Sequence, residues 1–206
     1  MRVGLVAVYF VGLLIAEALR WPQRVRRARS HTMGHVRDRR SRGPEFVVLF
    51  WIVLGMWVLP GAYAFSPVLR SFDYLLPSWV SWIGVGVFAA GLVVRWRAHR
   101  ALGAAWSPTL ETSSEHTLIT HGIYASIQHP IYAAMVLWAV AQPILLQNAL
   151  AGPAGLVAVG LLWLIRVPRE EAMMRERFGD GYRQYAARTG RMLPALHRSP
   201  PSSSER

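Results

Sequence analysis

Five apolar segments follow one another along the chain, and each is close to the length of a membrane crossing. They cover residues 3–19, 46–65, 79–94, 131–147 and 149–165. A helix needs roughly 20 apolar residues to cross a bilayer core, and backbone groups left unpaired in lipid are costly. The sequence therefore predicts an all-α integral membrane protein with about five transmembrane helices, the shorter ones tilted or flanked by arginines that reach the interface.

The last two apolar segments are separated only by Asn148, which predicts a helical hairpin. Pro143 and Pro153 lie near its turn, where helix-breaking residues are expected to mark the turn and kink both arms. In the third segment, small residues predict a face for close helix packing: Gly84, Gly86, Ala89, Ala90 and Gly91.

All 23 basic residues are arginines, and their distribution predicts the topology. Only Arg2 and Arg70 lie on one side of the expected bundle, whereas the other 21 lie in three blocks on the opposite side. The excess of cytoplasmic positive charge in membrane proteins then places the N-terminus outside and the C-terminus in the cytoplasm, in the cell's inner or plasma membrane. The net charge of +12 could suggest nucleic acid, but these blocks do not form a groove-facing stripe.

The first apolar segment allows two interpretations. Ala16, Glu17 and Ala18 resemble a small-residue cleavage site after an apolar run, so a signal peptide is conceivable. Cleavage there would require the export of nine downstream arginines, so we favour a retained helix. Glu17, near the cytoplasmic end of this helix, is then expected to reach the interface or to pair with Arg20.

The absence of cysteine excludes disulfides, thiolate chemistry and Cys-ligated zinc. His116, His121 and His129 follow no compact metal-ligand spacing, and no local pair of carboxylates completes a coordination sphere. The sequence therefore predicts no metal site.

Polar residues gather in two clusters, residues 116–132 before the fourth apolar segment and residues 166–185 after the fifth. Because these segments form a hairpin, both clusters are expected to meet in one pocket at the cytoplasmic lipid–water boundary. Simpler interpretations stay open: an interfacial aromatic belt with a turn at Gly122 and a helix start at Pro130, and a surface ion pair between Arg166 and Glu170.

The second cluster contains two helix-breaking signals. Pro168 either kinks the helix that carries Arg166 and Glu170 or begins a new one. Residues 178–181, Phe-Gly-Asp-Gly, are expected to terminate the helical segment.

The stretch "EHTLITHGIYASIQHPIYAAM", followed by "RVPREEAMMRERFGDGYRQYAARTGRMLP", resembles the isoprenylcysteine carboxyl methyltransferases and the related phospholipid N-methyltransferases. The resemblance covers roughly residues 95–194, whereas residues 1–94 match only in being hydrophobic. It implies an integral-membrane methyltransferase that uses S-adenosyl-L-methionine and releases S-adenosyl-L-homocysteine. No Gly-rich loop after a strand suggests a Rossmann domain.

The resemblance also implies roles for individual residues. Glu170 would hold the amino-acid end of the cofactor, and Arg166 would face the acceptor. The rest of the implied cofactor site is His116, Thr117, Leu118, Ile119, Gly122, Tyr124, His129, Pro130, Ile131 and Tyr132. The chain departs from the family at Gln128, where many members have Arg, and Pro168 leaves the relative geometry of Arg166 and Glu170 open.

The implied reaction is methyl transfer to a lipidic acceptor, either a carboxylate such as isoprenylcysteine or a lipid amine. The expected partners are the membrane and a lipid or prenylated small-molecule acceptor, with no nucleic acid and no obligate protein partner. A nicotinamide-dependent lipid or sterol reductase stays open, because the sterol reductases have a similar C-terminal region, as does a non-catalytic scaffold or transporter.

The expected organisation has three parts. Residues 1–94 carry the first three transmembrane helices with a basic cytoplasmic loop at 20–43, and residues 95–194 form the cofactor-binding region with the last two. A short cytoplasmic helix is expected near the end of that region. Residues 195–206 have the composition of a disordered tail.

Overall fold

The computed structural model describes residues 2–31, 43–102 and 118–195. Within these ranges the fold is helical, and the only β-type pairings are isolated bridges between Asp73 and Asn148 and between Ile127 and Gly190. The predicted all-α class is therefore confirmed. The first three apolar runs lie within a helix or an unbroken succession of helices. The last two are helical over residues 131–146 and 154–165, and residues 147–153 between them form the hairpin turn.

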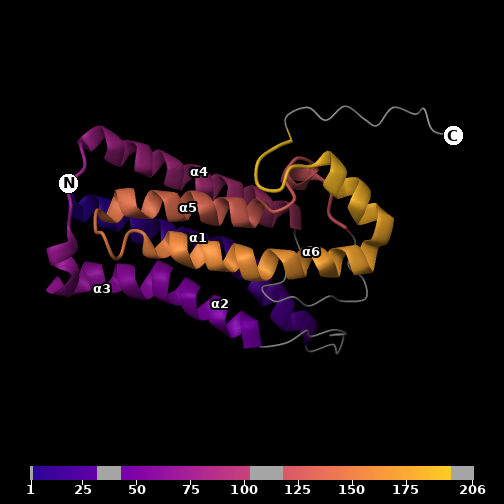
Figure 1. Ribbon diagram of the computed structural model, residues 1–206, viewed down its shortest axis with the longest axis horizontal. Coiled ribbons are helices and arrows are strands. Elements are labelled where there is room, and N and C mark those ends of the chain that lie inside the picture. The colour runs from indigo at the N-terminus through magenta and orange to yellow at the C-terminus, as the bar shows by residue number, and fades with distance from the viewer. Residues whose placement is uncertain (1, 32–42, 103–117, 196–206) are drawn as a thin grey trace.

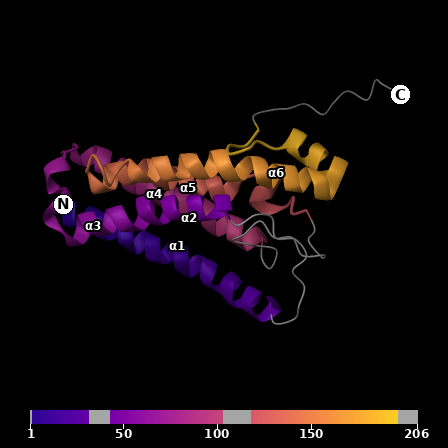
Figure 2. The same cartoon turned by 60° about the horizontal axis from the view of Figure 1, so that its bottom comes forward.

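Helices α1, α4 and α6 run in one direction, and α2–α3 and α5 run in the other (Figure 1). The second crossing is α2, a π-helical turn η1 and α3 in succession. The bounds are α1 (Arg2–His31), α2 (Gly43–Val53), η1 (Leu54–Val58), α3 (Leu59–Phe65), η2 (Pro67–Phe72), α4 (Ser78–Leu102), η4 (Gly122–Ala125), α5 (Pro130–Leu146) and α6 (Ala154–Arg188). Helices α5 and α6 form the predicted hairpin, and the far end of α1 diverges from the bundle (Figure 2).

Three helical stretches are long and apolar enough to cross a membrane: Arg2–Trp21, Phe46–Phe65 and Ser78–Leu102. Helix α5 is apolar but shorter. The chain is thus an integral membrane protein by the length and composition of its helices, and the count of five crossings stays a prediction.

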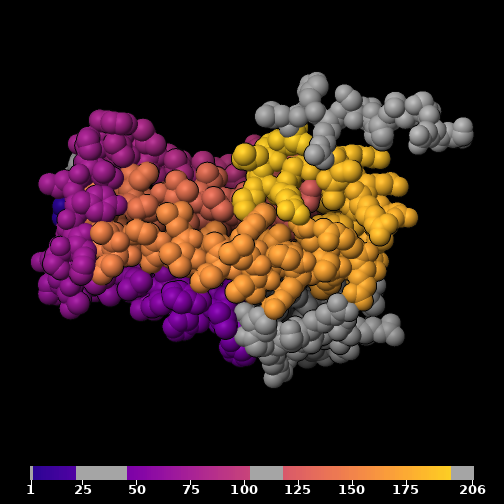
Figure 3. All heavy atoms as spheres, in the orientation of Figure 1, coloured from indigo at the N-terminus to yellow at the C-terminus, as the bar shows by residue number. Residues whose placement is uncertain are grey.

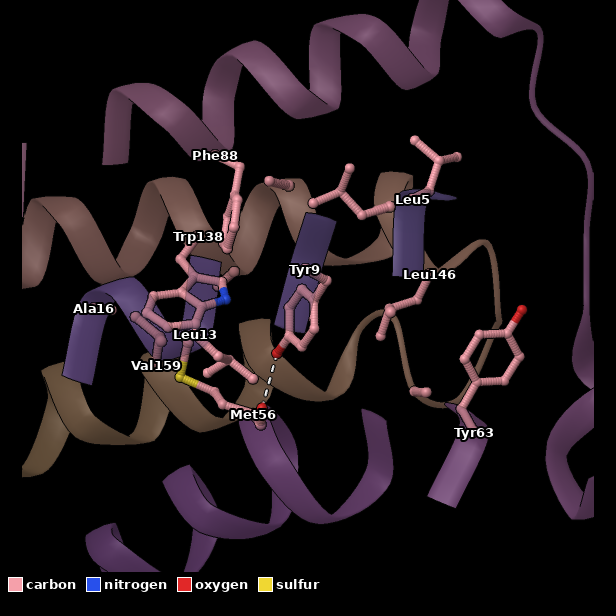
Figure 4. Close-up of a cluster of buried hydrophobic side chains, with 14 residues drawn as sticks. Leu5, Tyr9, Leu13, Ala16, Met56, Tyr63, Phe88, Trp138, Leu146 and Val159 are labelled. Atoms are coloured by element: carbon pink, nitrogen blue, oxygen red, sulfur yellow. Dashed lines mark hydrogen bonds between the residues drawn. The ribbon is translucent and has the colours of Figure 1, made fainter. Parts of the chain in front are cut away.

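The π-helical turn in the second crossing has a cause in the sequence. Pro60 has no N–H, so it cannot donate to the carbonyl of Met56 four residues earlier. The hydroxyl of Tyr9 donates to that carbonyl instead, at 2.8 Å (Figure 4). Gln142, fully buried in α5, donates to the neighbouring carbonyl of Gly55 at 2.8 Å, and its Oε1 lies 3.0 Å from the same hydroxyl of Tyr9. The bundle therefore satisfies these buried backbone groups through side chains of α1 and α5.

The small-residue face predicted for α4 is correct for only part of its residues. A Cβ atom on Gly84 would lie 2.5 Å from Ile144, and one on Gly91 would lie 3.2 Å from the carbonyl of Ala134, so both glycines allow α5 to approach closely. The other three residues were wrongly assigned to this face, because they are exposed on α4: Gly86, Ala89 and Ala90. Buried positions on α4 recur at helical spacing, and the other small residues lie on the opposite, exposed side of the helix.

One end of the bundle, which we call the turn end, joins the start of α1, η2 and the hairpin turn at residues 147–153. Arg2 forms an ion pair with Asp73 at 2.7 Å. Asn148, fully buried, donates to Asp73 at 3.0 Å and to the carbonyl of Leu69 at 2.6 Å. The two segments that carry few arginines, those of Arg2 and Arg70, therefore lie at the same end of the bundle. Pro143 lies inside the last turn of α5, and Pro153 directly precedes α6.

At the opposite end, which we call the site end, helices extend beyond the apolar segments. Helix α1 reaches His31, so residues 20–31 of the expected basic loop are helical, and α4 reaches Leu102. Helix α6 continues through Pro168 without a break. The termination expected at residues 178–181 is confirmed: helical geometry ends at Gly179 (φ 51°), where the chain turns, and a second helical segment then runs to Arg188. In Figure 1 this segment folds back toward the start of α5.

Candidate active site

The two polar clusters predicted from the sequence meet at the site end. The hydroxyl of Tyr132, in the first turn of α5, donates to Oε2 of Glu170 on α6 at 2.5 Å. His129, directly before α5, places Nε2 3.3 Å from Oε1 of Glu171. The hairpin therefore brings groups about 40 residues apart in sequence into direct contact, which confirms the expected meeting of the clusters.

Arg166 and Glu170 lie four residues apart on one uninterrupted stretch of α6, so they share a helix face. The guanidinium of Arg166 and the carboxylate of Glu170 both act electrostatically on the hydroxyl of Tyr132. Pro168, fitted into the helix and exposed, does not separate them. A cation, an anion and a phenol therefore lie together where α6 leaves the apolar part of the bundle.

Three aromatic rings line this group of charges. The ring of His129 lies 5.6 Å from that of Tyr132 and 5.8 Å, edge to face, from that of Trp163. Tyr132 and Trp163 are themselves 6.3 Å apart in an edge arrangement. Trp163 was not among the predicted site residues. Its signal was its position seven residues before Glu170, two helical turns away on the same side of α6.

The segment before α5 brings a further predicted residue to the cluster. Gly122 has a positive φ of 62°, which begins the 3-10 turn η4 at the expected position. This turn buries Tyr124. Burial, and then the negative charge of Glu170, raise the pKa of Tyr124 well above its ordinary value. Tyr124 is therefore a neutral phenol within electrostatic range of Glu170.

The structure describes four of the six remaining predicted residues. Pro130 occupies the first turn of α5, as expected for a residue without an N–H, and Ile131 is half-buried beside it. Leu118 and Ile119 are half-buried in the segment leading to η4. His116 and Thr117 lie outside the described residues.

Gln128, where the resemblance leads us to expect Arg, binds the C-terminal segment. Its side-chain amide donates to the carbonyl of Ala186 at 3.0 Å and to that of Thr189 at 2.7 Å. These carbonyls lie at the end of a helix, where no N–H of the helix can reach them. Gln128 therefore caps the last helical turn.

The sequence reasoning missed three further residues at this end of the molecule. Glu171 is 4% exposed, although only its neighbour Glu170 was given a role. Tyr185 donates through its hydroxyl to the carbonyl of Tyr124 at 2.9 Å. Burial raises the pKa of both Tyr182 and Tyr185 to about 12. Adjacent carboxylates and two tyrosines three residues apart were the available signals, but their orientation depends on the turn at Gly179.

Comparison with known proteins assigns the region that contains this cluster. Residues 82–176 match the isoprenylcysteine carboxyl methyltransferase family. The chain is 35% identical over 120 residues to the protein-S-isoprenylcysteine O-methyltransferase of Tribolium castaneum, covering 57% of this chain and 43% of that protein. It is 27% identical over 158 residues to protein-S-isoprenylcysteine O-methyltransferase A of Arabidopsis thaliana, covering 71% and 80% of the two chains.

A solved structure, that of a eukaryotic intramembrane Ras methyltransferase of the isoprenylcysteine carboxyl type, aligns with a TM-score of 0.52. The sequences are 29% identical, and the alignment covers 76% of this chain and 54% of that one. The fold is thus that of an all-helical integral membrane protein, and it is similar to that of a solved intramembrane methyltransferase. Residues 82–176 are therefore similar to the isoprenylcysteine carboxyl methyltransferase family, and the wider chain has a similar fold. The chain spans less than half the length of the Tribolium relative.

Proposed function

We propose that this protein transfers a methyl group from S-adenosyl-L-methionine to the carboxylate of an isoprenylcysteine-type lipid acceptor. The observation that carries this proposal is the contact of Tyr132 with Glu170, beside Arg166, within the region that matches the family. It joins an anion, a cation and aromatic surfaces at the end of an apolar bundle. A polar cofactor and a lipidic acceptor both need such a boundary.

The residues present fit S-adenosyl-L-methionine, whose amino-acid end carries an ammonium group and whose sulfur is cationic. Glu170 offers a carboxylate to the ammonium group, and the rings of Tyr124, His129 and Tyr132 offer faces suited to a cation. When bound, this cofactor supplies an electrophilic methyl group. Pro130, Ile131, Gly122 and residues 116–119 complete the proposed cofactor site.

Arg166 is proposed to orient the acceptor. A carboxylate is already a nucleophile at neutral pH, so the protein has to position it rather than remove a proton. The planar guanidinium can grip a carboxylate through two parallel hydrogen bonds. An amine acceptor would need a base to take its proton. The names of the relatives, O-methyltransferases of isoprenylcysteine, favour the carboxylate, and none of them favours nicotinamide-dependent reduction.

The test is incubation of detergent-purified protein with methyl-labelled S-adenosyl-L-methionine and an S-farnesyl cysteine whose only methyl acceptor is its carboxylate. We expect an ester that releases labelled methanol in base. Phosphatidylethanolamine, an amine acceptor, serves as the matched comparison. Label in the amine and none in the ester would overturn the choice of acceptor. Label in neither, together with no binding of S-adenosylhomocysteine, would overturn the proposed function.

We further propose that residues 95–194 carry the catalytic region and that the site end faces the cytoplasm. The positive-inside bias of the arginines supports this orientation. Because the chain lacks cysteine, single cysteines can be introduced at Ser71, exposed at the turn end, and at Gln184, exposed at the site end. An impermeant thiol reagent applied to intact cells should label only the first. Labelling of only the second would reverse the orientation.

A further inference from the structure

Glu171 is a buried carboxylate that the proposed reaction does not use. Its side chain is 5% exposed, and a carboxylate at such a depth is unfavourable unless it is paired. Three partners surround it: Nε2 of His129 at 3.3 Å from Oε1, Nη2 of Arg175 at 2.8 Å from Oε2, and Nη2 of Arg191 at 3.0 Å from Oε2. They come from the start of α5, from α6 itself and from the C-terminal segment. Glu171 therefore connects three separate parts of the chain.

The C-terminal segment is also bound to the start of α5 through the backbone. After the turn at Gly179 the chain returns, and the N–H of His129 donates to the carbonyl of Arg191 at 2.9 Å. The N–H of Gln128 donates to the carbonyl of Gly190 at 2.8 Å. In Figure 3 this segment (yellow) covers part of the site end.

These contacts form a closed circuit of three residues. The backbone of His129 binds the backbone of Arg191, the guanidinium of Arg191 binds Glu171, and the carboxylate of Glu171 contacts the ring of His129. Because a carboxylate can only accept, the circuit places the ring proton on Nε2 and leaves Nδ1 as an acceptor in the neutral imidazole. The circuit thus determines both the position and the tautomer of His129.

We propose that Glu171 and Arg191 are positioning residues for the cofactor site, acting together through the ring of His129. The C-terminal segment is then part of the site, because it holds the imidazole of His129 in place. The imidazole contacts the cofactor, whereas the C-terminal segment does not. This inference rests on the proposed function in one respect, that His129 binds S-adenosyl-L-methionine.

Arg175 provides a matched control. Both arginines contact the same carboxylate oxygen, and both are largely exposed, at 52% and 62% for Arg175 and Arg191. Arg175 lies one turn further along α6, and within the described part of the chain it makes no hydrogen bond to the start of α5. Arg191, in contrast, completes the circuit with His129. Loss of either arginine removes one exposed ion pair, but only loss of Arg191 opens the circuit.

The experiment measures the affinity for S-adenosylhomocysteine by calorimetric titration, with kcat and KM, in full-length parent protein and three variants. We expect Glu171→Gln to weaken affinity about tenfold and to raise KM for the methyl donor more than it lowers kcat. Arg191→Ala should weaken affinity about threefold to tenfold, and Arg175→Ala less than twofold. Equal effects of the two arginine variants, or an unchanged affinity in Glu171→Gln, would overturn the proposal.

A second measurement needs no cofactor and separates this proposal from the proposed function. Carbon-13 spectra of histidine-labelled protein report the ring tautomer, and the His129 signals are identified by their loss in His129→Gln. We expect those signals to shift in Glu171→Gln and Arg191→Ala and to stay in place in Arg175→Ala. If the parent fails to bind S-adenosylhomocysteine while this pattern holds, the proposed function fails and the circuit stands. If the pattern is absent, the circuit is refuted whatever the activity.

Discussion

The turn end and the site end of the bundle both bury polar side chains, but they use them differently. At the turn end, both polar atoms of the Asn148 side chain are fully hydrogen-bonded. Its amide nitrogen Nδ2 donates to two oxygens, and its side-chain oxygen Oδ1 accepts from the backbone N–H groups of Leu150 and Ala151 at 3.1 and 2.9 Å. At the site end, carboxylates gather beside aromatic rings and arginines, and the described contacts of Glu170 include a phenol donor, Tyr132.

The difference indicates how to separate a structural polar cluster from a functional one. A side chain whose hydrogen bonds all go to its own turn, or to the segment packed against it, is fully used in holding the fold. A carboxylate held mainly by a neutral hydroxyl keeps its charge available for a cation. By this criterion Asn148 is structural and Glu171, whose charge is already paired, holds its neighbours in place. The same criterion supports the proposal that Glu170 binds the cofactor.

The largest effect is expected from Asn148→Ala. The change leaves the N–H groups of Leu150 and Ala151 without their side-chain acceptor, and it should cost about 2–4 kcal/mol of unfolding free energy. The midpoint of thermal unfolding, followed by tryptophan fluorescence in detergent, should fall by about 5 °C or more. The affinity for S-adenosylhomocysteine at low temperature should not change.

Leu150→Ala, at an exposed neighbouring position, is the control, and it should shift the midpoint far less. If Asn148→Ala reduces cofactor affinity while leaving the midpoint in place, the assignment of the turn end as structural is wrong.

Glu170→Gln should give the reverse pattern. The amide oxygen can still accept from the hydroxyl of Tyr132, so the fold loses little, but the negative charge is gone. Affinity for S-adenosylhomocysteine should fall by about tenfold to a hundredfold, which corresponds to the loss of a charge-assisted hydrogen bond. Glu176→Gln, an exposed carboxylate further along α6, is the matched control and should bind like the parent.

Arg166→Lys should separate binding from turnover. Lysine keeps the charge but not the planar fork, so we expect cofactor affinity to stay within twofold while turnover on the farnesylated carboxylate falls about tenfold. Single-turnover assays at saturating methyl donor measure this directly. Turnover equal to that of the parent would remove Arg166 from the proposed acceptor site.

Features determined by local composition could be predicted from the sequence. The length of the apolar segments predicted the helices, and the single residue between the last two segments, Asn148, predicted the hairpin. The hairpin alone brought His129 and Tyr132 to α6, so the meeting of the clusters followed from topology.

Features that depend on helix phase and on tertiary hydrogen bonds could not be predicted. Gly86 lies between two packed glycines but on the outer face of α4. Glu170 and Glu171 have the same chemistry, and only the rotation of α6 decides which one contacts Tyr132. The run at Gly179 carried a correct turn signal, but the return of the chain depends on contacts with Gln128, more than 50 residues earlier.

The smallest effect is expected from Gln128→Arg, which introduces the residue that the resemblance leads us to expect at this position. A guanidinium has donors enough for both carbonyls that Gln128 now binds, those of Ala186 and Thr189. If the role of this position is to cap the last helical turn, the affinity for S-adenosylhomocysteine should change by less than about threefold. Gln128→Ala removes both hydrogen bonds and should instead speed amide hydrogen exchange in residues 186–190. The affinity for S-adenosylhomocysteine should fall as this last helical turn becomes less ordered. An affinity change of tenfold or more in Gln128→Arg, without a change in exchange, would mean that the added charge reaches the cofactor site. Capping the helix would then be secondary to an electrostatic role, and Gln128 would belong to the functional polar cluster rather than to the structural one.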